Sequence, residues 1–155
     1  MGNNQKSFSQ GDDLMSVEDD NKAIVRGYFD LLNRKDLPTE EWIAPLASNI
    51  VYHRAGMPDV TGLTGMKQML EMSRSAIANM HGTIEDLVAE GDKVVCRWSA
   101  RFTHQGEVMG VAPTGKVITV TGNAIYRIVN GKIQEEWDYR DLVGLMQQLG
   151  VAPQE

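Results

Sequence analysis

The spacing of apolar residues changes near residue 80, from the three- and four-residue intervals of helices to the two-residue alternation of strands. The first part predicts a helix that starts at Ser16 and ends before Pro38, a second helix over 39–47 and a third over 66–80. Ser16 is expected to cap the first helix, because acidic residues follow it in the first turn. A short extended segment, 50–53, separates the second and third helices.

Residues 83–139 alternate between apolar and polar side chains, which is typical of strands with one buried face. The hairpin turns Gly91-Asp92 and Asn130-Gly131 predict antiparallel strands, and a closing helix is expected over 141–149. Helices followed by long antiparallel strands predict an α+β fold, a cone-shaped curved antiparallel sheet packed on the N-terminal helices. The expected inward face carries Val94, Cys96, Trp98, Ala100, Phe102 and His104 on one strand, and Ile118, Val120, Ala124, Tyr126 and Ile128 on the next.

The length of 155 residues predicts one domain, which we place at 16–152, after a flexible tail at 1–15 that has no apolar period. The net charge of −6 argues against nucleic acid as a partner, since phosphate binding needs clustered basic residues. No apolar run approaches the roughly 20 residues of a membrane helix, and the polar start does not resemble a signal peptide. A cytoplasmic protein without a membrane partner is therefore expected.

Cys96 is the only cysteine, which excludes an internal disulfide. The three histidines are scattered and lack the spacing of metal ligands, so no metal site is expected. One of them, His81, is expected in a loop.

Four motifs follow one another in the second half of the chain: residues 106–116 read GEVMGVAPTGK, 126–133 read YRIVNGKI, 137–141 read WDYRD and 144–150 read GLMQQLG. In this order they resemble the SnoaL-like polyketide cyclase and ester cyclase family of the nuclear-transport-factor-2-like superfamily. The similarity runs over about residues 20–150. The resemblance implies a cone-shaped α+β domain that is usually dimeric. It also implies chemistry without a cofactor, in which an aspartate closes a ring by an intramolecular aldol reaction.

Asp138 matches the position of the family's acid/base aspartate. One carboxylate can take a proton from a carbon flanked by carbonyls and give one to the new alkoxide, if an apolar pocket raises its pKa. The alternative is a surface aspartate at a strand end. Asp141 is a second candidate for the pocket acid, or the N-cap of the closing helix. His104 and His53 are candidate polar contacts in the pocket, or hydrogen-bonded structural histidines.

Ala124 departs from the family, whose characterised cyclases have a histidine at the matching position beside the aspartate. Two hypotheses follow: a cofactor-independent enzyme acting on a small apolar carbonyl compound by aldol cyclase-type chemistry, or a non-catalytic small-molecule-binding protein. A hydratase or isomerase on the same fold is a third possibility. The side chains expected to line the pocket, or to form plain core, are Tyr28, Trp98, Phe102, Met109 and Tyr126.

The alternation in the last strand also predicts an oligomeric state. If Asp138 faces the interior, then Trp137, Tyr139, Glu135 and Ile133 face outward. Aromatic residues on an outer sheet face are typical of protein interfaces, so a homodimer is expected.

Overall fold

Helix α1 (Val17–Leu32) is the first element in the part of the chain that the computed structural model describes, residues 15–151. The Ser16 side chain accepts a hydrogen bond from the Asp19 backbone N–H at 3.1 Å, which confirms Ser16 as the N-cap. The tail predicted at 1–15 lies, apart from its last residue, outside the described residues. Val25 and Tyr28 are buried on the side of α1 that packs on the sheet.

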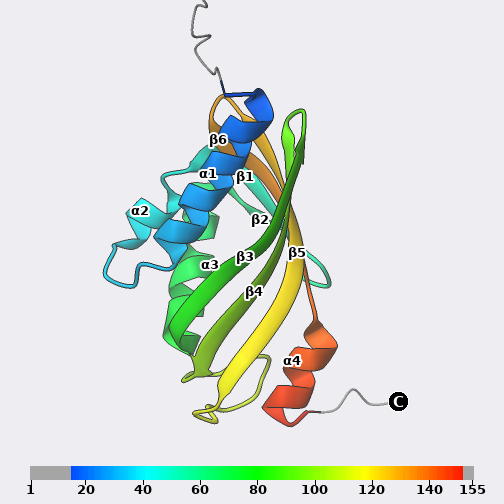
Figure 1. Ribbon diagram of the computed structural model, residues 1–155. Coiled ribbons are helices and arrows are strands. Elements are labelled where there is room, and N and C mark those ends of the chain that lie inside the picture. The colour runs from blue at the N-terminus through cyan, green and yellow to red at the C-terminus, as the bar shows by residue number, and fades with distance from the viewer. Residues whose placement is uncertain (1–14, 152–155) are drawn as a thin grey trace, which may run out of the picture.

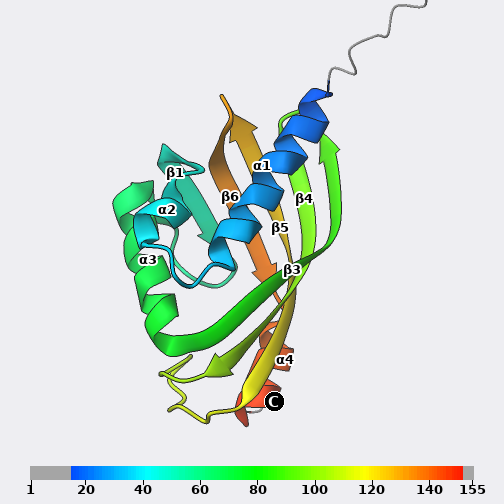
Figure 2. The same ribbon diagram turned by 60° about the vertical axis from the view of Figure 1, so that its left-hand side comes forward.

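A six-stranded sheet forms the body of the molecule, and α1, α2 and α3 cover its concave face (Figures 1 and 2). The strand order is β2-β1-β6-β5-β4-β3; β1 pairs with β6 in parallel, and every other pair in this order is antiparallel. Helix α4 lies apart from the other helices, at the lower end of the sheet (Figure 1). The α+β cone predicted from the sequence is thereby confirmed. The remaining elements are α2 (Thr39–Ile43), β1 (Leu46–Arg54), β2 (Val60–Thr61), α3 (Gly62–Ala76), β3 (Ile77–Glu90), β4 (Lys93–His104), β5 (Val117–Val129), β6 (Lys132–Arg140) and α4 (Leu142–Leu149).

Three predicted helix boundaries are wrong. The third helix starts at Gly62, four residues before the predicted residue 66. The second helix ends at Ile43 rather than at residue 47, because Leu46 already pairs with β6 as the first residue of β1. The third helix ends at Ala76, and Ile77 pairs with His104 at the start of β3. From Ile77 onward, pairing with β4 holds the chain in an extended conformation, although the apolar spacing would also allow a helix.

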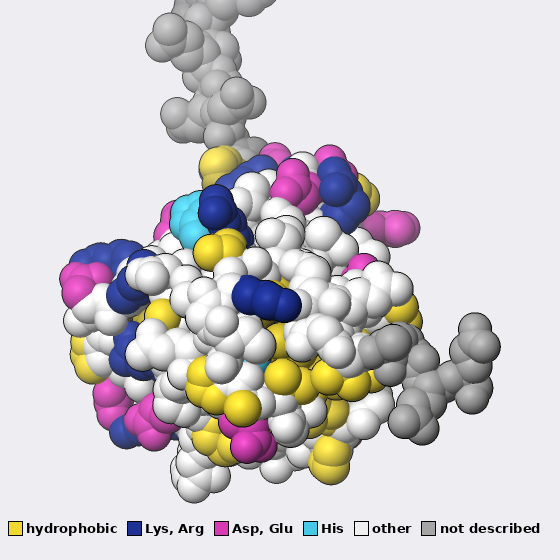
Figure 3. Space-filling model, turned by 90° about the horizontal axis from the view of Figure 1, so that it is seen from below, with side chains coloured by type: hydrophobic (Ala, Val, Ile, Leu, Met, Phe, Trp, Pro, Cys, Tyr) yellow, Lys and Arg dark blue, Asp and Glu magenta, His cyan; other side chains and the backbone are white. Residues whose placement is uncertain are grey.

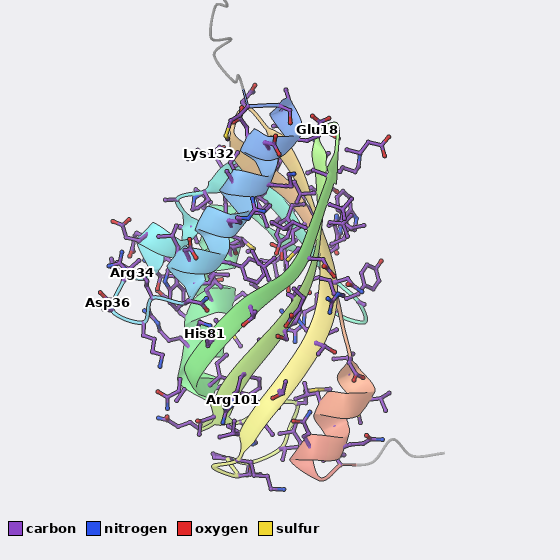
Figure 4. The ribbon with its side chains drawn as sticks, viewed as in Figure 1. Glu18, Arg34, Asp36, His81, Arg101 and Lys132 are labelled. Atoms are coloured by element: carbon purple, nitrogen blue, oxygen red, sulfur yellow. The ribbon has the colours of Figure 1, made fainter. Side chains whose placement is uncertain are left out.

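His81 therefore lies on β3 and not in a loop (Figure 4). The strand is irregular next to it: the register shifts between Ala78 and His81, and Asn79 has a positive φ of 52°. Such a β-bulge bends the strand and increases its twist locally.

The predicted hairpins, which join β3 to β4 and β5 to β6, are confirmed, and so are the predicted inward faces of β4 and β5. Asn130 and Gly131 both have positive φ, 49° and 73°, as a tight two-residue hairpin requires. Cys96 pairs with Ala124, and both side chains are buried.

The expectation that Ile133 faces outward is wrong, since its side chain is fully buried. Arg127 pairs with Glu135, but the next residue, Ile128, pairs with Ile133. Gln134 is therefore an extra residue, and this β-bulge shifts the alternation of side chains by one position. Ile133 consequently faces the same side of the sheet as Glu136. Within residues 15–151, no helix is long and apolar enough to cross a membrane.

Gly122→Ala is expected to lower the free energy of unfolding by about 1–3 kcal/mol, because the new methyl group has no room. A Cβ at Gly122 would clash with the Tyr139 carbonyl oxygen and would lie 2.6 Å from the Trp98 ring. Gly27→Ala, inside α1, is the matched control: its Cβ would meet nothing within 4 Å, so a gain of about 0.5–1 kcal/mol is expected. Urea denaturation measures both changes. A Gly122→Ala protein as stable as the wild type would contradict this close packing.

Candidate functional site

A cavity of about 560 Å³ lies between the concave face of the sheet and helices α1 to α3. Its wall is largely apolar, and three of the predicted lining residues, Tyr28, Trp98 and Tyr126, belong to it. The rings of Tyr28 and Tyr126 meet edge to face, with centroids 6.4 Å apart. Burial raises the pKa of both phenols, so their hydroxyl groups stay protonated.

Asp138 lies in the wall of this cavity and is 3% exposed. One of its oxygens, Oδ2, accepts hydrogen bonds from the Tyr52 hydroxyl at 2.8 Å and from Arg140 Nε at 2.6 Å. Arg140 also donates to the Tyr52 oxygen at 3.1 Å, which closes a triangle of three side chains. The other oxygen, Oδ1, is buried and has no hydrogen-bond partner among the described residues. The carboxylate is therefore held by one oxygen and free at the other.

Tyr52 acts as a hydrogen-bond donor in this triangle. Burial raises the pKa of its phenol, against the opposing charge of Arg140, so the hydroxyl keeps its proton. Arg140 supplies the countercharge that a buried carboxylate requires, and about a third of its side chain, 32%, is exposed.

Glu136 is a second buried carboxyl group on the same face of β6, two residues before Asp138. Burial, and then the nearby charge of Asp138, raise the pKa of Glu136 to about 8, although Arg140 and Tyr126 act in the opposite direction. At neutral pH Glu136 is therefore a neutral acid, which can donate a hydrogen bond. Its Oε2 is buried and finds no hydrogen-bond partner within residues 15–151.

Two of the other predicted site residues are buried outside the cavity wall. Phe102 belongs to the hydrophobic core, and His104 is fully buried at the end of β4. His104 Nδ1 accepts a hydrogen bond from the Thr114 backbone N–H at 3.3 Å and lies 2.9 Å from the Thr114 hydroxyl oxygen. This contact ties His104 to the turn after β4, while its Nε2 is buried without a hydrogen-bond partner among the described residues.

His53 lies on the opposite side of the sheet from the cavity. Its ring nitrogens lie 3.0 Å from Asp59 Oδ1 and 2.8 Å from Glu135 Oε1, and the ring stacks on Trp137 at 5.4 Å. The hydrogen bond with Glu135 makes the largest contribution to raising the pKa of His53. Its neighbour Tyr52 occupies the inward position that the prediction gave to His53.

Met109 and Asp141 are both exposed and lie outside the cavity wall. Met109 is on the β4–β5 connection at the lower end of the molecule, where hydrophobic side chains gather when the surface is viewed from below (Figure 3). Asp141 caps α4, since its side chain accepts a hydrogen bond from the Gly144 backbone N–H at 2.8 Å.

Sequence reasoning did not select four residues that meet around Asp138, namely Tyr52, Arg54, Glu136 and Arg140. Counting in steps of two from Asp138 would have found Glu136 and Arg140, because strand side chains alternate. The β1 residues carry no comparable signal, since the parallel pairing of Tyr52 with Glu136 and of Arg54 with Asp138 follows from the fold alone.

Comparisons with known proteins agree with this architecture. A family profile described as SnoaL-like polyketide cyclase matches residues 22–149. AclR, a candidate hydroxylase from Streptomyces galilaeus, is 29% identical with a TM-score of 0.76, covering 88% of this chain and 99% of its own. IdmH, a candidate polyketide cyclase from Streptomyces antibioticus, is 30% identical with a TM-score of 0.72, covering 84% and 99%. A SnoaL-like protein from Jannaschia sp. CCS1 shares the fold at 20% identity, with a TM-score of 0.81 and coverage of 92% and 100%. No functionally curated protein is significantly similar to the chain.

Glu136→Gln is expected to raise the thermal midpoint relative to the wild type, by an amount that grows as the pH rises from about 5 to 8. The folded protein keeps Glu136 protonated up to a pKa of about 8, whereas in the unfolded chain the carboxyl ionises above its ordinary value of 4.5. Between these values the wild type loses stability as the pH rises, and a glutamine does not ionise. Calorimetric scans across this range measure the difference.

Glu135→Gln is the matched control, and the opposite sign is expected for it. His53, then Arg127, hold the pKa of Glu135 below its ordinary value. This carboxylate therefore contributes stability at neutral pH that is lost as the pH falls through its pKa. If the thermal midpoint of Glu136→Gln equals that of the wild type at every pH, the conclusion that Glu136 is neutral in the folded protein is wrong.

Proposed function

Because this chain belongs to the SnoaL-like polyketide cyclase family, we propose that it is an enzyme that removes a proton from a carbon beside a carbonyl group. Its substrate would be a small, largely apolar compound enclosed by the cavity wall. The observation that carries the proposal is the pair of carboxyl groups in that wall: Asp138 is anchored at one oxygen by Tyr52 and Arg140, and Glu136 is kept neutral by burial. Two carboxyl groups in different surroundings within one pocket are typical of acid/base sites.

In the proposed mechanism, Asp138 Oδ1 takes the proton from the α-carbon and leaves an enolate. Tyr52 and Arg140 stay bound to Oδ2, so they keep the carboxylate oriented throughout. The neutral acid of Glu136 donates a hydrogen bond to the enolate oxygen and so stabilises the charge that develops there. Asp138 then returns its proton, either to the alkoxide of an aldol closure or to another carbon in an isomerisation.

Ala124 favours a second candidate, a non-catalytic binding protein for small molecules. Ala124 pairs in register with Asp138, so it lies where the resemblance implies a histidine, and its methyl group cannot bind a carbonyl or an enolate. The next experiment separates the two candidates, because a binding protein has no turnover to lose.

Asp138→Asn is expected to reduce the exchange of α-hydrogens of 2-tetralone for deuterium by at least about 100-fold, since the amide cannot act as the base. Proton NMR in D2O follows the loss of the α-hydrogen signal. Binding of the ketone should persist in the variant. Wild-type protein that binds 2-tetralone without speeding its exchange would contradict the enzymatic proposal and support the binding protein.

The control for this experiment is Glu136→Gln, which keeps a hydrogen-bond donor at the site and should keep most of the exchange rate. In the wild type, kcat/KM for exchange should fall as the pH rises through about 8, where Glu136 loses its proton. In Glu136→Gln this decline should vanish.

We also propose that two chains associate through the outer face of the sheet. The side chains on that face are Asn123, Ile125, Arg127, Trp137 and Tyr139, and Tyr139 is 58% exposed. A mixture of aromatic residues and arginine is typical of protein interfaces.

Trp137→Glu is therefore expected to shift the protein from dimer toward monomer, because it places a charge in the apolar part of this face. Sedimentation velocity at micromolar concentration measures the shift. Met72→Glu is the matched control, since Met72 is 73% exposed on α3, on the other side of the sheet. A wild type that is already monomeric would contradict the proposed interface.

A further inference from the structure

The wall of the cavity is rich in positive charge, although the whole chain carries a net charge of −6. Its basic side chains are Lys35, Arg54, Arg74 and Arg140. The acidic groups in the wall are Glu136, which is neutral at pH 7, and Asp138. A single carboxylate thus faces four cations. A cleft lined mainly by one sign of charge concentrates ions of the opposite charge.

Two of these cations are engaged with the protein on the side of the cavity near α2. Arg74 lies 3.9 Å above the Trp42 ring and donates to backbone carbonyl groups. Lys35 donates to the Asn79 side chain at 3.0 Å. Their charges add to the positive potential of the cavity, but some of their N–H donors already bind other groups of the protein.

Arg54 differs from the other three. Arg140 is held by Asp138, whereas the Arg54 side chain makes no hydrogen bond or ion pair within residues 15–151. Arg54 follows Tyr52 on the inward face of β1 and pairs in register with Asp138 on β6. Partial burial, and then the charge of Arg140, lower its pKa, which reflects a cation with too little solvent or countercharge around it.

We propose that Arg54 binds a carboxylate of the substrate, so that the enzyme acts on a small, largely apolar carbonyl compound that bears a carboxylate group. The inference rests on the proposed function, since it takes this cavity as the substrate site. The N–H groups of a guanidinium match the two oxygens of a carboxylate, and such charge-assisted pairs are strong. Bound in this way, the substrate is oriented with its reactive carbon beside Asp138, while apolar side chains such as Met66 and Met69 enclose the rest.

Calorimetric titration of the full chain with 2-naphthoate and with 2-naphthamide tests this assignment, because the two probes share their shape and differ in charge. Wild-type protein should bind 2-naphthoate at least about tenfold more tightly. The preference should shrink between 20 and 500 mM salt, since Arg54 is only partly buried. Arg54→Gln should remove the preference by weakening 2-naphthoate binding alone, and Arg54→Lys should keep part of it.

Arg26→Gln is the matched control, because Arg26 is exposed on α1 and outside the cavity wall, so its loss should change neither affinity. Equal affinity for the two probes, no measurable binding of 2-naphthoate, or an unchanged preference in Arg54→Gln would each overturn the proposal. Should Arg54→Gln not fold, the wild type decides: a preference that high salt removes supports the proposal, and one that salt leaves intact overturns it.

The outcome is separable from that of the proposed function. Asp138→Asn should still bind 2-naphthoate, and more tightly, because a neighbouring negative charge is gone. If the protein prefers 2-naphthoate through Arg54 but does not exchange the hydrogens of 2-tetralone, the anion site is supported and the general-base role of Asp138 is contradicted. If exchange depends on Asp138 but the protein shows no preference for 2-naphthoate, only the anion-site proposal is contradicted.

Discussion

One extra residue in β6 determines which side chains of that strand face the cavity. Because Gln134 has no residue opposite it, Ile133 points into the core on one side of the bulge, and Glu136 and Asp138 point inward on the other. A regular strand would place Ile133 on the same face as Glu135 and Trp137. The bulge therefore allows one short strand to anchor the core and to supply both acids of the site.

The two acids of the site lie in different surroundings. Asp138 has a guanidinium and a phenol on one oxygen, which compensate for burying a charge. Glu136 is buried and has no ion pair among the described residues, and the Asp138 carboxylate lies two residues along on the same face of β6, so the neutral form is favoured. The Asp138 carboxylate therefore contributes to keeping Glu136 protonated.

Periodicity and turn chemistry predicted the α+β cone and the hairpins, whereas Asp138 was selected only because it matches the family's acid/base aspartate. They failed where tertiary pairing decided the outcome. Residues 77–80 satisfy a helical and an extended pattern equally, and their pairing with the end of β4 selects the strand. A one-residue bulge has no signature in the sequence, so Ile133 was placed on the wrong face. Arg54 and Tyr52 could not be found because their position depends on which strand becomes the neighbour of β1.

The parallel pairing of β1 with β6 also bears on how the protein folds. The hydrogen bond between Tyr52 and Asp138 joins residues 86 positions apart, and the strands in between form by local hairpins. Long-range contacts of this kind are slow to form, because a large loop must close first. The anchored carboxylate is thus completed only when the last strand of the sheet joins one of the first, and a nascent chain has no site until β6 has been synthesised.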